Sequence, residues 1–66
     1  MPYESIKDLP NGVKDNLPVH AQEIYQSTYN NAYREYDGDE ERAHRIAWAA
    51  VKNKYEKSDN GWHKKD

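Results

Sequence analysis

The stretch His44–Tyr55, HRIAWAAVKNKY, holds the densest run of apolar residues in a chain that has little apolar material. Four of these residues follow the i, i+1, i+4, i+5 spacing of one helical stripe: Ile46, Ala47, Ala50 and Val51. Trp48 points about 100° away from Ala47, so it either closes one flank of the core or faces a partner. The stretch therefore predicts an amphipathic helix at the centre of a helical domain.

A second long helix is predicted from Val19 to Tyr36. Its apolar and aromatic positions recur at spacings of three and four, with Gln22 on the solvent side. Gly38 suits the left-handed residue that closes a helix, and Asp39 suits the cap of the next helix, from about Glu40 to Tyr55 or Lys57. A connection this short predicts that the two long helices pack antiparallel. The stripe of the second helix consists of Ala21, Ile24, Tyr25, Thr28, Tyr29, Ala32 and Tyr36.

The N-terminal part predicts a short first helix. Asp8 is expected to cap it, and Pro10 falls in its first turn, where the missing N–H costs nothing. Asn11-Gly12 also allows a turn at this place. Three residues at every fourth position would form the apolar face: Leu9, Val13 and Leu17.

The C-terminal tail carries Trp62, a residue that seldom hangs free in solvent. Residues 58–61, Ser-Asp-Asn-Gly, predict a turn before it. We expect the tail to fold back on the helices, with a minor β pairing between the Pro2-Tyr3 segment and the Trp62 segment. The predicted fold is mainly α, a compact bundle of a short first helix and two long antiparallel helices.

Composition limits the class of protein. Sixty-six residues predict one domain, 1–66, and the absence of cysteine excludes disulfides and thiolate metal sites. Charged residues make up 33% of the chain, yet the net charge is −2, which argues against strong nonspecific binding to nucleic acid. No run approaches the roughly 18 apolar residues of a membrane span. No signal peptide is visible in MPYESIKDLP, so we expect a cytoplasmic protein.

No arrangement of residues predicts catalysis, a cofactor or a metal. The histidines His20, His44 and His63 lie in three different segments without a ligand-spaced pair, so structural roles are favoured. The four acids between Asp37 and Glu41 are too compact for a calcium loop, and they suit capping and a solvated corner. The serines lack a base or an elbow motif. We therefore expect neither an enzyme nor a protein with a small-molecule substrate.

The segment from Lys52 to Lys65 is basic. Five lysines stand against Glu56 and Asp59, which gives +3, and Trp62 lies among them. Basic residues with an aromatic side chain can contact nucleic acid or anionic lipid. A solvated helix end with a packed tryptophan explains the same pattern.

Taken together, the order of landmarks resembles the ChaB family. The most specific parts are LPVHAQEIY, HRIAWAAVK and the terminal WHKK, in a match from Met1 to about Lys65. Family members often carry a longer charged connection between the second and third helices, which is reduced here to DGDEE, and Thr28 and Tyr29 stand where Ala and Phe are usual.

The resemblance implies about three helices with a minor β element, no catalytic activity, and regulation of a ChaA-type cation (Na⁺, Ca²⁺ or K⁺)/proton antiporter contacted from the cytosolic side. It also leads us to expect a monomer, peripheral at the inner face of the membrane. ChaB-like domains also occur joined to domains associated with nucleic-acid binding. A nucleic-acid accessory protein is therefore the alternative function. The predicted partner-binding residues are exposed positions of the third helix and tail, with Trp48 included if it faces solvent: Arg42, Arg45, Trp48, Lys52, Trp62, Lys64 and Lys65.

Overall fold

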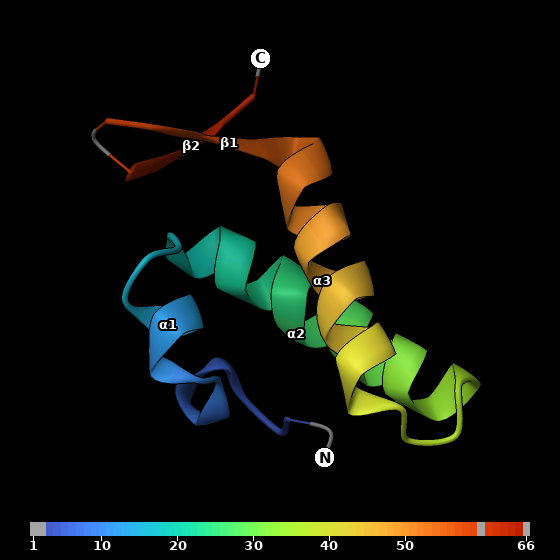
Figure 1. The fold of residues 1–66 in the computed structure, drawn as a ribbon. Coiled ribbons are helices and arrows are strands. Elements are labelled where there is room, and N and C mark those ends of the chain that lie inside the picture. The colour runs from blue at the N-terminus through green and yellow to red at the C-terminus, as the bar shows by residue number, and fades with distance from the viewer. Residues whose placement is uncertain (1–2, 60, 66) are drawn as a thin grey trace.

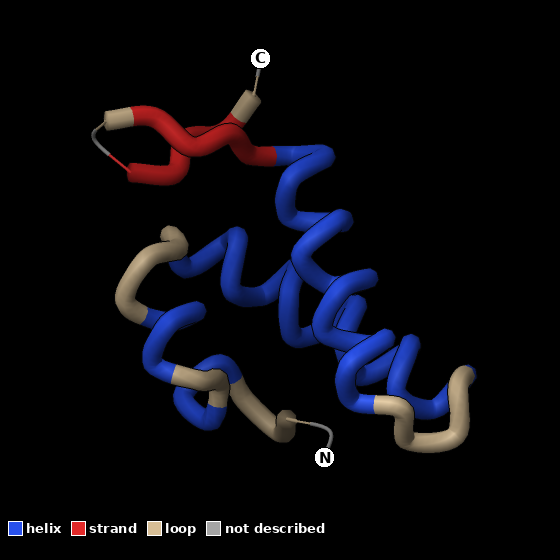
Figure 2. The backbone as a smooth tube through the Cα atoms, in the orientation of Figure 1, coloured by secondary structure: helices blue, strands red, loops and turns tan. Residues whose placement is uncertain are grey.

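Two long helices and a C-terminal β-hairpin dominate the computed structural model, which describes residues 3–59 and 61–65 (Figure 1). The hairpin continues directly from the last helix and lies at one end of the helical part (Figure 2). The fold is therefore mainly α, as predicted. In chain order, the elements are η1 (Ile6–Asp8), α1 (Asn11–Lys14), α2 (Val19–Glu35), α3 (Glu40–Lys54), β1 (Tyr55–Ser58) and β2 (Gly61–Lys64).

The helices α2 and α3 pack antiparallel. The start of α2 contacts the residue that follows α3: His20 Nδ1 lies 3.1 Å from the hydroxyl of Tyr55. Further along, the rings of Tyr25 and Trp48 meet edge to face with their centroids 5.8 Å apart. The order of these contacts confirms the antiparallel prediction.

The corner between the helices has the predicted chemistry. Gly38 is left-handed with φ 82°, and Asp37 beside it has φ 55°. The carboxylate of Asp39 accepts the backbone N–H of Arg42 at 3.1 Å, as an N-cap residue does. The acids Glu40 and Glu41 in the first turn suit the positive end of the α3 dipole.

The core lies between α2, α3 and the N-terminal segment. Ala47 and Val51 are fully buried, whereas Ile46 and Ala50 are only half-buried. The buried line of α3 therefore runs through positions four residues apart, and the predicted stripe is turned slightly away from it. The buried apolar residues are Leu9, Val13, Leu17, Ala21, Tyr25, Tyr29, Ala32, Ala43, Ala47, Val51 and Tyr55.

Three details of α1 and the start of α2 differ from the prediction. Asp8 ends η1 instead of capping a helix, and Pro10 is the N-cap residue of α1. Gln22 is buried with 8% exposure, although its spacing predicted a solvent position. Its Nε2 donates to the carbonyl oxygens of Leu17 at 2.8 Å and Lys14 at 3.2 Å. The side chain thus satisfies carbonyl groups at the end of the preceding segment, which a helical period cannot reveal.

The predicted β pairing of the tail with the N-terminus is wrong. The Trp62 strand pairs with β1, in a register that sets Lys57 opposite Trp62. Tyr3 instead bonds to α2, where its N–H donates to Asn30 Oδ1 at 2.8 Å, while Pro2 lies outside the described residues. The third helix also stops at Lys54, because residues 55–57 leave the helix to form β1.

The packed tyrosines predict a loss of stability at high pH. Burial raises the pKa of Tyr29 to about 12, and burial also raises the pKa of Tyr25 above its usual range. Both stay protonated in the fold when the unfolded chain ionises near pH 10.0. The unfolded state then binds fewer protons, so the free energy of unfolding should fall as pH rises from about 10 to about 12.

Urea titrations across this range measure that fall. Tyr29→Phe removes one of the groups that ionise preferentially on unfolding, so its stability should depend less on pH. Tyr36→Phe replaces an exposed tyrosine and should keep the wild-type dependence. Identical slopes in both variants would contradict the assignment.

Candidate interaction surface

Five exposed lysines gather where α3 runs into the hairpin. The negative end of the helix dipole favours cations in the last turn of α3, and the antiparallel register carries residues 64 and 65 back to this end. The N–H of Lys65 donates to the carbonyl oxygen of Lys54 at 2.8 Å and closes the arrangement. We call this surface the basic end. It consists of Lys52, Lys54, Lys57, Lys64 and Lys65.

The basic end keeps its charge available. Within residues 3–59 and 61–65, the ion pairs join Asp39 to Arg42 and Glu41 to Arg45, and none involves a lysine of the basic end. Its five lysines stand against Glu56 and Asp59, which leaves +3. Such a surface attracts an acidic partner or an anionic surface over several ångströms.

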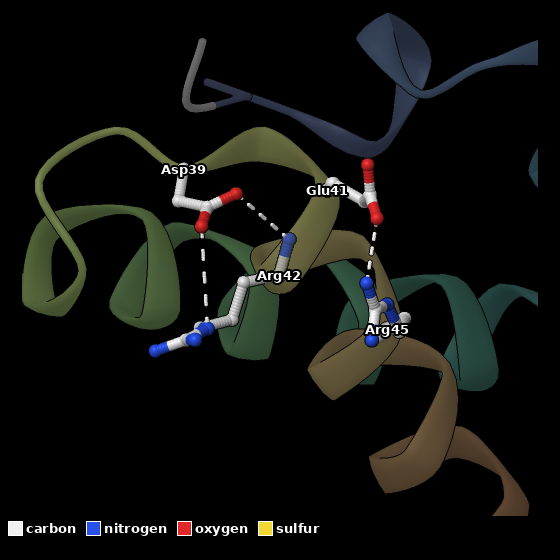
Figure 3. Close-up of polar contacts among 4 residues, drawn as sticks. All are labelled: Asp39, Glu41, Arg42 and Arg45. Carbon is white, nitrogen blue, oxygen red and sulfur yellow. Dashed lines mark hydrogen bonds and ion pairs between the residues drawn. The ribbon is translucent and has the colours of Figure 1, made fainter.

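The two arginines of the predicted site lie near the other end of α3 (Figure 3). Arg42 Nε is 4.0 Å from Asp39, and its guanidinium carbon lies 4.8 Å from the ring centre of Tyr36. Arg45 bonds to Glu41 at 2.5 Å. Ten residues of helix separate Arg42 from Lys52, about 15 Å along the axis. The predicted site residues therefore form two groups instead of one patch.

Both tryptophans of the predicted site are half-buried. The ring centres of Trp48 and Trp62 lie 5.7 Å apart, and Trp48 also packs edge to face on Tyr25. A third neighbour, His44, lies 6.2 Å from Trp48. Trp48 thus closes one flank of the core, and Trp62 joins the hairpin to the helices through it.

Two of the three histidines, His20 and His44, have a tyrosine hydroxyl as partner. His44 Nδ1 lies 2.6 Å from the hydroxyl of Tyr25, which matches the structural role predicted for this histidine. No group of three metal-ligating side chains comes together in the described part of the chain. Within the same residues, no helix has the length and apolar character that crossing a membrane requires.

The described residues form open surface grooves, and the two best defined do not collect the predicted site residues. A groove of about 350 Å³ follows the outer face of α2 from His20 to Thr28. Another, of about 310 Å³, lies between Tyr3, Pro10 and the first turns of α3. The exposed charge of the basic end, and not a cavity, is the most distinctive surface feature.

The sequence prediction missed two parts of this surface. Lys54 and Lys57 belong to the charge count but are not among the predicted site residues. The hairpin itself also carried a signal, since Asn-Gly at 60–61 is a strong hairpin dipeptide between strand-like runs. The dipeptide predicts a hairpin at this place but not its register, since Asn-Gly as the two loop residues would set 59 opposite 62, whereas the structure sets Ser58 opposite Gly61.

Comparison with known proteins agrees with the fold and the motifs. The ChaB family model matches residues 9–65. Relatives named "Putative cation transport regulator ChaB" from Escherichia coli strain K12, Escherichia coli O157:H7 and Shigella flexneri are each 47% identical, over 98% of this chain and 99% of theirs. An NMR solution structure of a protein with the same name has a TM-score of 0.86 and 47% identity, and the match covers 98% of this chain and all of that one. The chain belongs to the ChaB family.

Proposed function

We propose that this protein is a non-enzymatic interaction module that regulates a cation/proton antiporter of the ChaA type from its cytosolic side. The observation that carries the proposal is the family membership, because relatives matched over almost their whole length are named for the regulation of cation transport. The unpaired lysines of the basic end supply a surface for such contact. A single domain, 1–66, acting as a cytosolic monomer would suffice for this role.

The basic end is the part of the surface that we assign to the transporter. The cytosolic leaflet is negatively charged, and each lysine near it contributes about 1 kcal/mol of attraction. A contact there would hold the protein at the membrane surface, where it can reach cytosolic loops of a transporter. Arg42 and Arg45 add exposed cations on the same helix, although their acidic partners reduce the charge that they offer.

Regulation requires that the protein bind one state of the transporter more tightly than another. A bound protein shifts the balance between transporter conformations only by its difference in affinity for them. The charge of the basic end is suited to this task if acidic loops are exposed in one conformation and covered in the other. A change in transport rate or in cation preference would follow without any chemistry by this protein.

Antiport measurements in inverted membrane vesicles test the proposal. Wild-type protein at saturation should change the rate or the cation dependence of proton exchange. Lys52→Glu combined with Lys64→Glu should lose most of the effect, because the charge of the basic end changes from +3 to −1. Lys7→Glu combined with Arg34→Glu makes the same change of −4 elsewhere on the exposed surface and should keep the effect. Transport that is unaffected by the wild-type protein would refute the proposal.

A nucleic-acid accessory is the second candidate, and the basic end with Trp62 is the observation that favours it. Half-burial of the Trp62 ring against Trp48 leaves less of its face for a base to stack on. Binding to DNA or RNA would weaken steeply with added salt as counterions are released. A salt-dependent shift of DNA with no effect in the vesicles would favour this candidate.

A further inference from the structure

The outer edge of β2 presents backbone groups without a partner in the described structure. The bond from Lys65 N–H to Lys54 O marks a hydrogen-bonded position of the antiparallel pair. Hydrogen-bonded and non-hydrogen-bonded pairs alternate along such a ladder. Trp62 and Lys64 therefore occupy non-hydrogen-bonded positions, and their N–H and C=O groups point away from β1.

The two edges of the hairpin are not equivalent. On β1, the corresponding outward positions are Tyr55 and Lys57, and the Tyr55 N–H already bonds to Val51 O at the end of α3. On β2, the register leaves Trp62 and Lys64 without ladder bonds, and no other backbone bond among the described residues uses them. The edge of β2 is thus the better template for another strand. A two-stranded sheet is marginal by itself, and a third strand would stabilise it.

From these features we infer that the outer edge of β2 binds an extended acidic segment of a partner protein, which adds to the hairpin as a third strand. Backbone bonds to residues 62 and 64 would supply much of the affinity. A residue of the added strand opposite Lys64 lies on the same face as its ammonium group, so an acid there forms a cross-strand pair. Because the basic end carries a charge of +3, acidic residues are also favoured at the neighbouring positions of the bound segment.

The same charge argues against a second copy of this chain as the occupant. Pairing two β2 edges would bring Lys64 and Lys65 of each copy close to those of the other. Like charges on adjacent strands are destabilising, and lysines commonly protect exposed edges from self-association in this way. Pairing of β2 with a second copy of β2 is therefore disfavoured, and pairing with an acidic strand is favoured.

This inference rests on the proposed function, because it names the chemistry of the segment that the basic end would recognise in its partner. It can be tested separately with peptides of about eight residues, a common strand length. The probe alternates glutamate with threonine, and the matched control alternates lysine with threonine. A third peptide has the glutamate sequence with alternate backbone nitrogens methylated, which removes its donors along one edge.

NMR titration of the protein at low salt should show the glutamate peptide shifting the amide signals of Trp62 and Lys64 and slowing their hydrogen exchange. The lysine peptide and the methylated peptide should produce much smaller shifts. Equal binding of all three, or shifts confined to the helices, would overturn the inference. A DNA oligonucleotide shifting these amides when the glutamate peptide does not would overturn it in favour of nucleic acid.

Variants at one position separate the backbone from the charge. Lys64→Ala removes the ammonium group and keeps the outward N–H, whereas Lys64→Pro removes both without removing a bond of the β1–β2 ladder. The proline variant should bind about fivefold more weakly than the alanine variant, as expected for one lost hydrogen bond. Equal affinities would overturn strand addition. Peptide binding together with unchanged antiport would refute the proposed function alone, whereas an antiport effect without peptide binding would refute this inference alone.

Discussion

Replacing Ala47 with aspartate is expected to unfold the domain. Ala47 is fully buried on the face of α3 that packs against α2. Burial of an unpaired carboxylate costs several kcal/mol, whether the group stays ionised or takes up a proton. A core of this size supplies only about 3–5 kcal/mol of net stability. The single substitution therefore removes most or all of the stability, and thermal melts followed by far-ultraviolet circular dichroism should show little helix at any temperature.

The helix supplies its own matched control two residues further on. Ala49→Asp makes the same chemical change at an exposed position of α3, so it should alter stability by no more than about 0.5 kcal/mol. Ala50→Asp at a half-buried position should fall between the two. A melt of Ala47→Asp that coincides with the wild-type melt would show that this face does not form the interface.

The long helices could be predicted because their signals are local and repeated. Apolar residues at spacings of three and four fixed both the type of element and the buried face of α2, where Tyr25 and Tyr29 are buried as expected. The corner was predictable for the same reason, because a glycine and a capping aspartate have strong position-specific preferences. Each signal involves residues within one or two turns of each other.

The hairpin could not be placed from local preference alone. Tyr55, Glu56 and Lys57 continue the period of α3 and include good helix formers, so propensity favoured a longer helix. Pairing with β2 and packing of Trp62 on Trp48 override that preference, and both involve residues distant in sequence. The burial of Gln22 has the same origin, since its partners are carbonyl groups of another segment.

The candidate site was predictable in charge and not in arrangement. Counting lysines gave the +3 of the C-terminal segment, and this count does not depend on the fold. The pairing of Arg42 and Arg45 with acids on the preceding turn depends on side-chain conformation, which composition does not contain. The outward direction of the Trp62 and Lys64 backbone groups depends on strand register, so it became visible only in the structure.

Truncation of Trp48 to alanine is expected to cause the second large effect. Replacing a fully buried tryptophan with alanine lowers the free energy of unfolding by about 3–5 kcal/mol. Trp48 is half-buried, so the expected loss is about 2–3 kcal/mol. The variant should keep its helices at low temperature while the hairpin loses its anchor, because Trp62 then has no ring to pack against. Urea unfolding measures the overall loss, and amide exchange in residues 55–58 and 61–64 measures the local one.

Three further variants decide whether the two rings act together. Trp48→Phe keeps a ring and should recover much of the stability. Trp62→Ala should open the hairpin with a smaller global loss, since Tyr25 and His44 still pack on Trp48. A double-mutant cycle of the two alanine substitutions should give a coupling energy of about 0.5–1.5 kcal/mol. Strict additivity would mean that the two rings stabilise the fold independently of each other.

The same variant links the core to the proposed surface. Trp48→Ala changes no lysine of the basic end and no backbone group of β2, so any loss of affinity for the glutamate peptide must come from the loss of a positioned hairpin. We expect that affinity to fall together with the exchange protection of β2, and Trp48→Phe to restore both. Unchanged affinity in the alanine variant would mean that charge alone recognises the peptide. The half-buried tryptophan would then serve stability only, and the recognition surface would not depend on how the hairpin is held.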